Sequence, residues 1–203
     1  YQPEGVSLGS GVSKFGLPPF ITSFFSSNIT ARNLCLGDIT NFEVNVNGNI
    51  DTATWDFGDG SPAASSVSPN HTYTAIGNYN VTVTLVVEGT PITNSKNITI
   101  SALPDAFPSS LTQCSLTSAM TDIPFNLSQA TDVINGGNSN LLVSYFKLQS
   151  DANNNISELP TNYSNVTNPE QIFAKVLNPL TGCYTLTTLD LIVNSSTNPE
   201  ISI

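Results

Sequence analysis

The sequence contains few charged residues, and very few of them are basic. Only 10% of its 203 residues are charged, and five lysines and arginines stand against fifteen acidic residues, which gives a net charge of -10. A nucleic-acid-binding protein needs clustered basic residues to displace phosphate counterions, and an anionic membrane surface needs a similar cluster. The basic residues here are scattered singly, so we expect no nucleic-acid partner and no docking on anionic lipid.

Histidine and cysteine are also scarce. There is one histidine, His71, and the three cysteines, Cys35, Cys114 and Cys183, form no CxxC pair. Structural zinc sites use four such ligands, usually in closely spaced pairs, and nucleophilic triads use a histidine as base. We therefore expect no structural zinc site. Because the chain also lacks a supporting catalytic motif, we expect no enzyme activity and no cofactor.

Long apolar runs and strong helix formers are missing too. No run reaches the 18 or more apolar residues of a membrane-spanning helix, and the composition does not suit a coiled coil. Asn, Ser and Thr replace the missing charges, while apolar residues still make up 39% of the chain, too many for a disordered protein. The length suits two domains of about 100 residues each.

The apolar residues that are present alternate with polar ones. Phe42, Val44 and Val46 follow this pattern, as do 81–87 and 97–100. Alternation indicates antiparallel strands with one buried face, and the Gly-, Asn- and Pro-rich breaks fall at β-sandwich spacing. After Leu103, further apolar runs cover 123–127, 141–148, 171–177 and 184–193, with one helical turn expected at 128–133 and a turn at 151–155.

These runs predict an all-β fold of two tandem immunoglobulin-like β-sandwiches joined by a short linker. We expect the domains at 28–103 and 104–194, with a linker to a further module at 195–203. Residues 1–27 are predicted to be a linker, or the tail of a preceding module, with one apolar strand. That strand is a candidate for assembly between chains through Phe20, Ile21, Phe24 and Phe25. We interpret the chain as a mature or excised fragment of an exported protein.

The most specific motif is the stretch Thr54-Trp-Asp-Phe-Gly-Asp-Gly-Ser61, followed by His71-Thr-Tyr73 and by Gly77-Asn-Tyr79. Together these motifs resemble the PKD (polycystic kidney disease) domain, an immunoglobulin-like β-sandwich of extracellular proteins, over about residues 28–102. The resemblance assigns the family's structural motif to nine residues: Trp55, Asp56, Gly58, Asp59, Gly60, His71, Tyr73, Gly77 and Tyr79.

Each residue type suits a structural role in that motif. An indole at position 55 can be buried between two sheets. Gly58 and Gly60 permit the positive φ angles of a tight reversal, in which Asp56 and Asp59 can accept backbone N–H groups. Tyr79 stands where a tyrosine-corner hydroxyl would bind upstream backbone.

Some PKD domains of secreted bacterial enzymes bind calcium through acidic residues near the strand before the tryptophan. Asp51 is the nearest candidate ligand here, and the alternative is that the local aspartates are purely structural. Calcium is the one cofactor that stays open.

The C-terminal half has Leu111-Thr-Gln-Cys114 near its start and Thr181-Gly-Cys-Tyr-Thr-Leu186 before the apolar run at 189–193. With this spacing it resembles immunoglobulin-like repeats that follow PKD domains in large surface proteins of Bacteroidota. Many of these proteins are exported by type IX secretion and act in adhesion or gliding. Cys114 and Cys183 lie near the first strand and the last hairpin, which meet in a sandwich, so we predict a disulfide between them and a buried thiol at Cys35. Candidate glycosylation sites are Thr52, Asn80, Asn97 and Asn165.

Three functions fit these observations. The first is a non-catalytic, extracellular, cell-surface protein whose stalk or adhesin modules contact neighbouring modules of the same chain and a surface glycan or protein ligand. The second is a filament subunit that binds copies of itself by strand addition. The third is an accessory binding domain of a secreted hydrolase, which an exposed row of aromatic residues would support.

Overall fold

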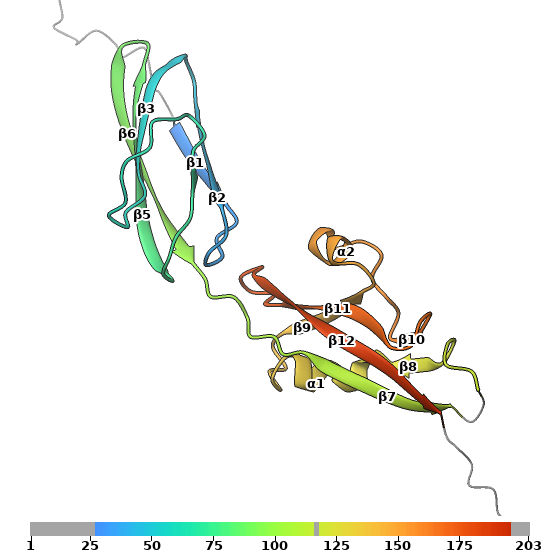
Figure 1. Ribbon diagram of the computed structural model, residues 1–203. Helices are drawn as coiled ribbons and strands as arrows, with labels where there is room; N and C mark the ends of the chain where they lie inside the picture. The colour runs from blue at the N-terminus through green and yellow to red at the C-terminus, as the bar shows by residue number, and fades with distance from the viewer. Residues whose placement is uncertain (1–26, 116–117, 196–203) are drawn as a thin grey trace, which may run out of the picture. The chain divides into compact units, whose positions relative to one another are not determined.

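The computed structural model describes residues 27–115 and 118–195. The candidate assembly strand at Phe20, Ile21, Phe24 and Phe25 lies outside these residues. The described chain is almost entirely strands and turns, as the alternating sequence predicts, and it forms the all-β, immunoglobulin-like folds expected (Figure 1). None of the helices within the described ranges has the length and apolar character needed to cross a membrane.

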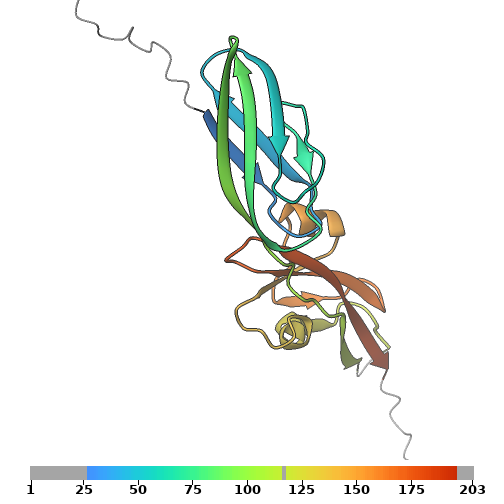
Figure 2. The same cartoon turned by 90° about the vertical axis from the view of Figure 1, so that its left-hand side faces the viewer.

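Residues 27–101 form two three-stranded sheets, in the orders β1-β2-β4 and β3-β5-β6. Their strands are β1 (Ser27–Arg32), β2 (Thr40–Val46), β3 (Ile50–Asp56), β4 (Asn70–His71), β5 (Gly77–Val87) and β6 (Thr90–Ile100). The two sheets form separate layers, with the long β5–β6 hairpin in one of them (Figure 2).

The predicted alternation determines what this first sandwich buries. Phe42 and Val44 of β2 are buried, and so are Val81, Val83, Leu85 and Val87 of β5, while the residues between them are exposed or half-buried. Side chains point to opposite faces along a strand, so each sheet has one apolar face for the interior. Trp55, Phe57 and Ala53 add to this interior from β3 and the residue that follows it.

Residues 102–195 contain a four-stranded sheet, β7-β12-β11-β9, and a two-stranded sheet, β10-β8. The strands are β7 (Ser109–Ser115), β8 (Pro124–Asn126), β9 (Leu142–Phe146), β10 (Asn162–Ser164), β11 (Glu170–Leu177) and β12 (Tyr184–Ser195). A 3-10 helix η1 (Leu127–Ala130) continues into α1 (Thr131–Ile134), which confirms the predicted helical turn. The predicted turn at 151–155 is wrong, because 149–154 form α2 (Gln149–Asn154).

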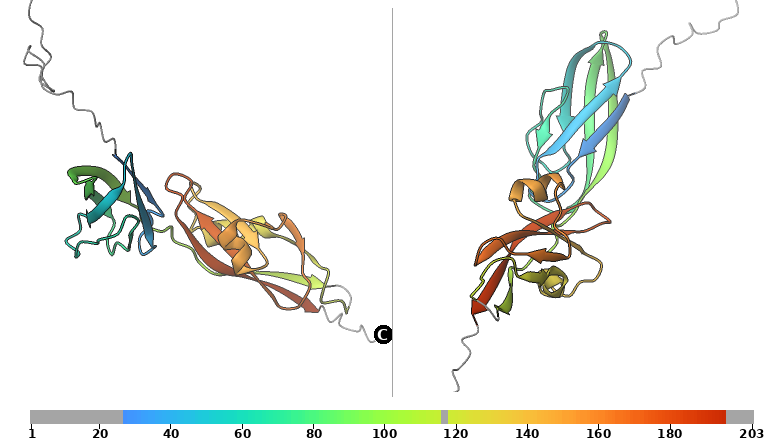
Figure 3. Two further views of the ribbon diagram at one scale, coloured as in Figure 1. Left: turned by 90° about the horizontal axis from the view of Figure 1, so that it is seen from above. Right: turned by 90° about the vertical axis from the view of Figure 1, so that its right-hand side faces the viewer.

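The two helical segments lie on opposite faces of the four-stranded sheet (Figure 3). Ala174 and Val176 of β11 belong to the buried cluster that contains Leu127, Ala130 and Ile134. Lys175, between them, must point to the other face, where its ammonium donates a 2.9 Å hydrogen bond to the carbonyl oxygen of Ala152 in α2.

Candidate functional site

Trp55, the second residue of the motif at 54–61, has no exposed surface. Its ring packs at 5.7 Å, centroid to centroid, from that of Phe42, which in turn lies 5.2 Å from Phe57. Backbone hydrogen bonds in both directions join Trp55 to Ala64, and the indole N–H donates to the carbonyl oxygen of Ser66 at 2.8 Å. The indole is therefore a fully bonded core group and offers no surface to a ligand.

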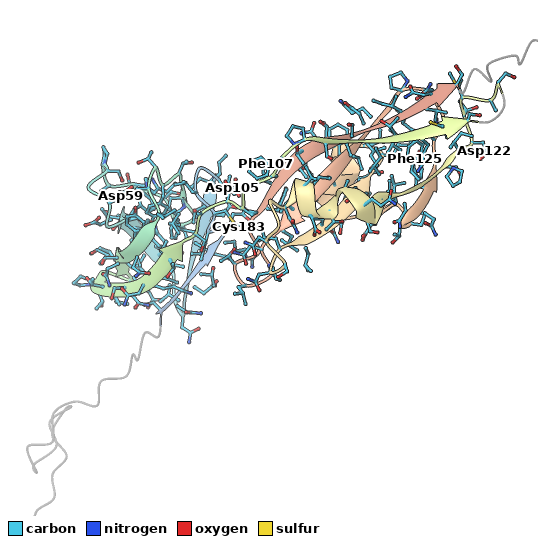
Figure 4. All side chains as sticks on the ribbon, turned by 90° about the horizontal axis from the view of Figure 1, so that it is seen from below. Asp59, Asp105, Phe107, Asp122, Phe125 and Cys183 are labelled. Atoms are coloured by element: carbon cyan, nitrogen blue, oxygen red, sulfur yellow. A yellow bond between two sulfur atoms is a disulfide. The ribbon has the colours of Figure 1, made fainter. Side chains whose placement is uncertain are left out.

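The two aspartates of the motif hold the loop after β3. A carboxylate oxygen of Asp56 accepts the N–H of Gly58 at 2.9 Å, and one of Asp59 accepts the N–H of Ser61 at 3.0 Å. Gly58 has φ +76°, and a Cβ there would come within 2.6 Å of the carbonyl oxygen of Asn80. Figure 4 labels Asp59 on the first sandwich. These bonds are the Asx-type bonds that the sequence predicts, and they give the carboxylates a structural role.

The aromatic residues of the motif form a stack. The rings of His71 and Tyr73 meet edge to face at 4.6 Å, and those of Tyr73 and Tyr79 lie 4.4 Å apart. Tyr73 is buried, and the Tyr79 hydroxyl donates to the carbonyl oxygen of Ala75 at 2.9 Å. The tyrosine hydroxyl thus binds upstream backbone. The imidazole lies against aromatic carbon, which is a packing role.

Asp51, the candidate calcium ligand, accepts the N–H of Gly89 through Oδ2 at 2.9 Å. It thereby ties the start of β3 to the turn between β5 and β6. In the part of the chain that the structure describes, no group of three His, Cys, Asp or Glu side chains could hold a metal ion.

The predicted Cys114–Cys183 disulfide is wrong. The disulfide joins Cys35 to Cys183, which are 148 residues apart in sequence and 5.6 Å apart between their Cα atoms. Cys114 is a free, exposed cysteine. The first strand of the second domain does pair with the last one, but in parallel, and this register places Cys114 beside Asn194. Eleven residues of extended strand, about 36 Å, separate Asn194 from Cys183.

Both bonded cysteines are held by nearby backbone. On either side of Cys35, Leu36 N–H donates to the Ser101 carbonyl, and Ser101 N–H donates to the Leu34 carbonyl, each at 2.9 Å. Cys183 is fully buried, and its carbonyl oxygen accepts the N–H of Asn178 at 2.8 Å. The two cysteines belong to one compact unit, which comprises 31–41, 70–79 and 97–203.

Tyr184 directly follows Cys183 in the sequence, and its ring contacts Lys175 of the neighbouring strand β11. The Lys175 ammonium is 4.0 Å from the centroid of the Tyr184 ring, and the Tyr184 hydroxyl donates to Asn153 at 3.1 Å. Burial lowers the pKa of Lys175. Lys175 is therefore a core cation that fixes α2 to the sheet through Ala152 and the aromatic ring.

A second buried polar group holds the loop before β11. The Glu170 carboxylate accepts the Tyr163 hydroxyl at 2.8 Å and the N–H of Val166 at 2.7 Å. Burial, together with the hydrogen bond to Glu170 and its negative charge, raises the pKa of Tyr163 to about 12. Burial likewise raises the pKa of Tyr145, whose hydroxyl bonds to that of Thr131.

The candidate glycosylation sites differ in exposure. Thr52, Asn80 and Asn97 lie on exposed positions of β3, β5 and β6. Asn165 is 1% exposed, and its amide nitrogen donates to the carbonyl oxygens of Met120 and Thr167, both at 2.8 Å. A glycan at Asn165 would require both bonds to break and the side chain to leave the interior, so the structure favours the other three candidates.

The sequence did not reveal a hollow of about 470 Å³ that is lined by residues of 102–107 and 135–141 and by Asn178. Asp105 and Phe107 lie on the stretch that leads into β7 (Figure 4). The Phe107 ring is 47% exposed, and Gly136 lies beneath it: a Cβ at Gly136 would be 3.0 Å from the ring. Phe107 was the one residue of this hollow that the sequence could have suggested as a ligand contact. The polar residues around it come from distant segments of the chain, so no local pattern indicates the hollow.

Hydrogen bonds to nearby backbone fix the asparagine side chains of this hollow. Asn135 accepts the N–H of Gly137 and donates to the Asn138 carbonyl, while Asn138 accepts the N–H of Asn140 through its side-chain oxygen. Asn178 accepts the N–H of Leu180 in the same way. The amide NH₂ groups of Asn138 and Asn178 and the Asp105 carboxylate have no partner among the described residues.

Comparison with known proteins agrees with this architecture. The family model of the PKD domain matches residues 25–101, and a model described as the Flavobacterium inter-domain disulphide bond domain matches residues 110–197. The two matches agree with the expected order of a PKD-like segment followed by an immunoglobulin-like one, and the observed disulfide joins a residue of the first matched segment to a residue of the second. No curated protein matches the chain.

Three solved structures are similar to parts of the chain. The PKD1 domain of Vibrio anguillarum Epp is 22% identical over 38% of this chain and 94% of its own, with a TM-score of 0.34. The PKD1 domain of the Vibrio cholerae metalloprotease PrtV is 25% identical over 37% and 95%, with a TM-score of 0.33. The fibronectin(III)-like modules of Clostridium thermocellum CbhA are 12% identical over 83% and 95%, with a TM-score of 0.34.

Proposed function

We propose that this PKD domain and the immunoglobulin-like domain after it form a non-catalytic spacer in an extracellular, multidomain surface protein of the adhesion type. The observation that carries the proposal is the Cys35–Cys183 disulfide, which covalently joins the two matched segments. Disulfides persist in oxidising compartments, so this bond supports an extracellular location. The bond limits how far residue 35 of the first matched segment can move away from residue 183 of the second, which is useful in a spacer.

The structural roles of the motif residues support the same proposal. Asp56, Asp59 and Tyr79 bond to nearby backbone, and Trp55 is enclosed in the core. A general acid or base needs a group that a substrate can reach. The most recognisable residues of the chain are instead committed to the fold, so we place the protein among surface proteins of the stalk or adhesin class.

The proposal is tested in the parent surface protein on the cells that produce it. Residues 27–195 are replaced by an unrelated pair of β-sandwich domains of similar length, and adhesion is compared with that of a deletion of the same residues. A spacer predicts that the replacement restores most of the adhesion that the deletion abolishes. Loss of adhesion in both variants, with equal surface levels, would show that these residues themselves carry the activity.

A second candidate function, weak binding of a neutral sugar, is favoured by the hollow beside Phe107. The exposed ring gives a pyranose an apolar face to stack on, and the Asp105 carboxylate can accept its hydroxyl protons. The amide NH₂ groups of Asn138 and Asn178 need acceptors, which a hydroxyl provides and an ammonium does not. The net charge of -10 and the carboxylate disfavour anionic sugars.

Ligand-observed NMR with methyl glycosides of neutral hexoses, and with a glucuronide as the anionic comparison, tests this second candidate. We expect Phe107→Ala to weaken binding of a neutral glycoside about tenfold, which corresponds to about 1.4 kcal/mol. Leu180→Ala is the matched control, because Leu180 is 93% exposed and does not line the hollow. Equal signals from Phe107→Ala and the control would refute the site.

A further inference from the structure

The position of the disulfide in the chain gives it a mechanical consequence. Only β1 precedes Cys35 among the described strands, and only β12 follows Cys183. All the other described strands, β2 to β11, lie inside the covalent ring that the bond closes. The shortest covalent path from Ser27 to Ser195 therefore runs along β1, across the two sulfur atoms, and along β12.

We propose that the Cys35–Cys183 bond acts as a tension bypass, which carries a pull applied to the two ends of the protein past residues 36–182. A pull on the flanking chain is borne by the shortest covalent path, because covalent bonds stretch far less than folded chain can extend. Residues inside the ring then carry no end-to-end tension. The use of this bypass to the organism rests on the proposed spacer function. The covalent path itself depends only on the disulfide of this chain.

The segments left in the path are suited to tension. β12 is a 12-residue strand whose start directly follows Cys183, so a pull between Cys183 and Ser195 acts along its own axis. A strand rises about 3.3 Å per residue, close to the limit of about 3.6 Å for a fully extended chain. Such a strand gains little length by leaving its sheet, so tension between its ends provides little work to remove it.

The sheet also holds β12 on both sides. It pairs with β11 over eight residues, from Tyr184 to Leu191, and with β7 over seven, from Leu189 to Ser195. Its inward side chains Leu189, Leu191 and Val193 are buried. For β12 to leave its sheet, the antiparallel ladder with β11 and the parallel ladder with β7 must both break. The pulled segment is thus a strand held along its whole length.

The anchor residues keep the bond in place under load. Cys183 is fully buried at the end of the β11–β12 turn, where its N–H donates to the Thr181 hydroxyl at 3.2 Å. Cys35 is half-buried and flanked by the two backbone bonds to Ser101. Burial limits the approach of a thiolate to the sulfur atoms, and exchange by a thiolate is the route by which disulfides break. The bypass is therefore expected to persist in the folded protein.

Single-molecule force spectroscopy tests the proposal on the 203-residue chain, pulled from its two ends between marker domains of known length. In the oxidised protein, the total extension should be smaller than that of the fully unfolded chain without the disulfide. The difference is the length of the 148 residues between the cysteines, which is roughly 500 Å of extended chain. The same protein pulled in the presence of a thiol reductant should release that missing length in a step that depends on reductant concentration. The variant Cys114→Ser should behave as the unmodified protein does.

The double variant Cys35→Ser/Cys183→Ala separates the bypass from other causes of a short extension. It should show unfolding of the enclosed strands and the full length without reductant. If this variant does not fold, the reductant-dependent step in the unmodified protein still tests the proposal. Full extension of the oxidised protein would overturn the bypass, and so would a short extension that persists after the bond has been reduced in denaturant before the pull. Neither result bears on the adhesion assay, in which the spacer function is tested separately.

Discussion

The indole N–H of Trp55 donates to the carbonyl oxygen of Ser66 at 2.8 Å, from a side chain with no exposed surface. This bond joins the indole to the segment 64–66, and backbone hydrogen bonds in both directions join Trp55 to Ala64 of the same segment. Because the indole is both the largest core side chain and a hydrogen-bond donor, we expect the first sandwich to depend on it more than on any other residue.

Replacing Trp55 with alanine should lower the free energy of unfolding of the first sandwich by about 3–5 kcal/mol, because it leaves a large cavity and an unbonded Ser66 carbonyl. Trp55→Phe keeps most of the ring, so it should lower that free energy by less. Denaturation followed by circular dichroism measures both. A loss of less than about 1 kcal/mol for Trp55→Ala would contradict the central position of the indole.

Two glycines of the same loop offer a matched pair. Gly58 and Gly60 have φ angles of +76° and +80°, but a Cβ at Gly58 would meet the Asn80 carbonyl oxygen at 2.6 Å, and a Cβ at Gly60 would meet nothing within 4 Å. Gly60→Ala should cost about 1–2 kcal/mol of unfolding free energy for the left-handed conformation alone. Gly58→Ala should cost about 1–3 kcal/mol more because of the clash. Equal losses in thermal denaturation would show that the backbone can move aside.

Much of the first sandwich could be predicted from sequence, and the reason is local. The alternation in β2 and β5, and the turn chemistry of Asp56 to Gly60, are properties of neighbouring residues. The disulfide was not predictable in this way, because it depends on the direction in which β7 pairs with β12. Parallel and antiparallel pairing give similar alternation in sequence, yet they place Cys114 at opposite ends of its partner strand.

Two features of the second domain, the helix α2 and the hollow beside Phe107, were not predicted because both depend on residues far apart in the sequence. The helix α2 contains Ser, Asp and Asn, which favour turns, but Lys175 fixes it from a strand more than twenty residues away. The contact with Lys175 therefore stabilises a helix in a segment whose residues favour a turn. The hollow beside Phe107 likewise combines three distant segments, which no local pattern can bring together.

The observed pairing of cysteines predicts which thiol reacts. In the folded, unreduced protein we expect one equivalent of maleimide to attach to Cys114, which is exposed, and Cys114→Ser to abolish this labelling. Mass spectrometry of unreduced peptides should recover Cys35 linked to Cys183 in both proteins. Labelling that survives in Cys114→Ser would instead show that Cys35 or Cys183 is free.

Loss of the disulfide should also lower stability. In the chain-entropy description, a bond that closes a ring of this length stabilises the folded state by up to about 5 kcal/mol, with typical measured values of about 2–4 kcal/mol. Thermal unfolding of Cys35→Ser/Cys183→Ala should therefore begin at a lower temperature than that of Cys114→Ser, which keeps the bond. Identical unfolding of the two variants would mean that the ring contributes no stability.

Tyr163 should make stability fall at alkaline pH. Its pKa is raised to about 12 in the folded protein, from 10.0 for a free tyrosine, so folding favours the protonated phenol. This contribution is fully present below about pH 10 and is lost as the pH rises towards about 12. We expect Tyr163→Phe to reduce the loss of stability over that window. Denaturation curves at pH 8 and pH 11 measure the effect, and an unchanged pH dependence in the variant would contradict the raised pKa of Tyr163.

A negative charge introduced at position 165 should destabilise the second domain. Its side-chain oxygen accepts the N–H of Ile123 at 2.9 Å, and its nitrogen donates to the carbonyl oxygens of Met120 and Thr167. Asn165→Asp keeps the shape but turns the donor into a negative oxygen facing two carbonyl oxygens in the interior. We expect a loss of about 3 kcal/mol or more in unfolding free energy. Asn162→Asp, at an exposed position of β10, is the control and should cost less than about 0.5 kcal/mol. Because a buried carboxyl can take up a proton and become a donor again, the stability of Asn165→Asp should recover towards acidic pH, while that of the control should not.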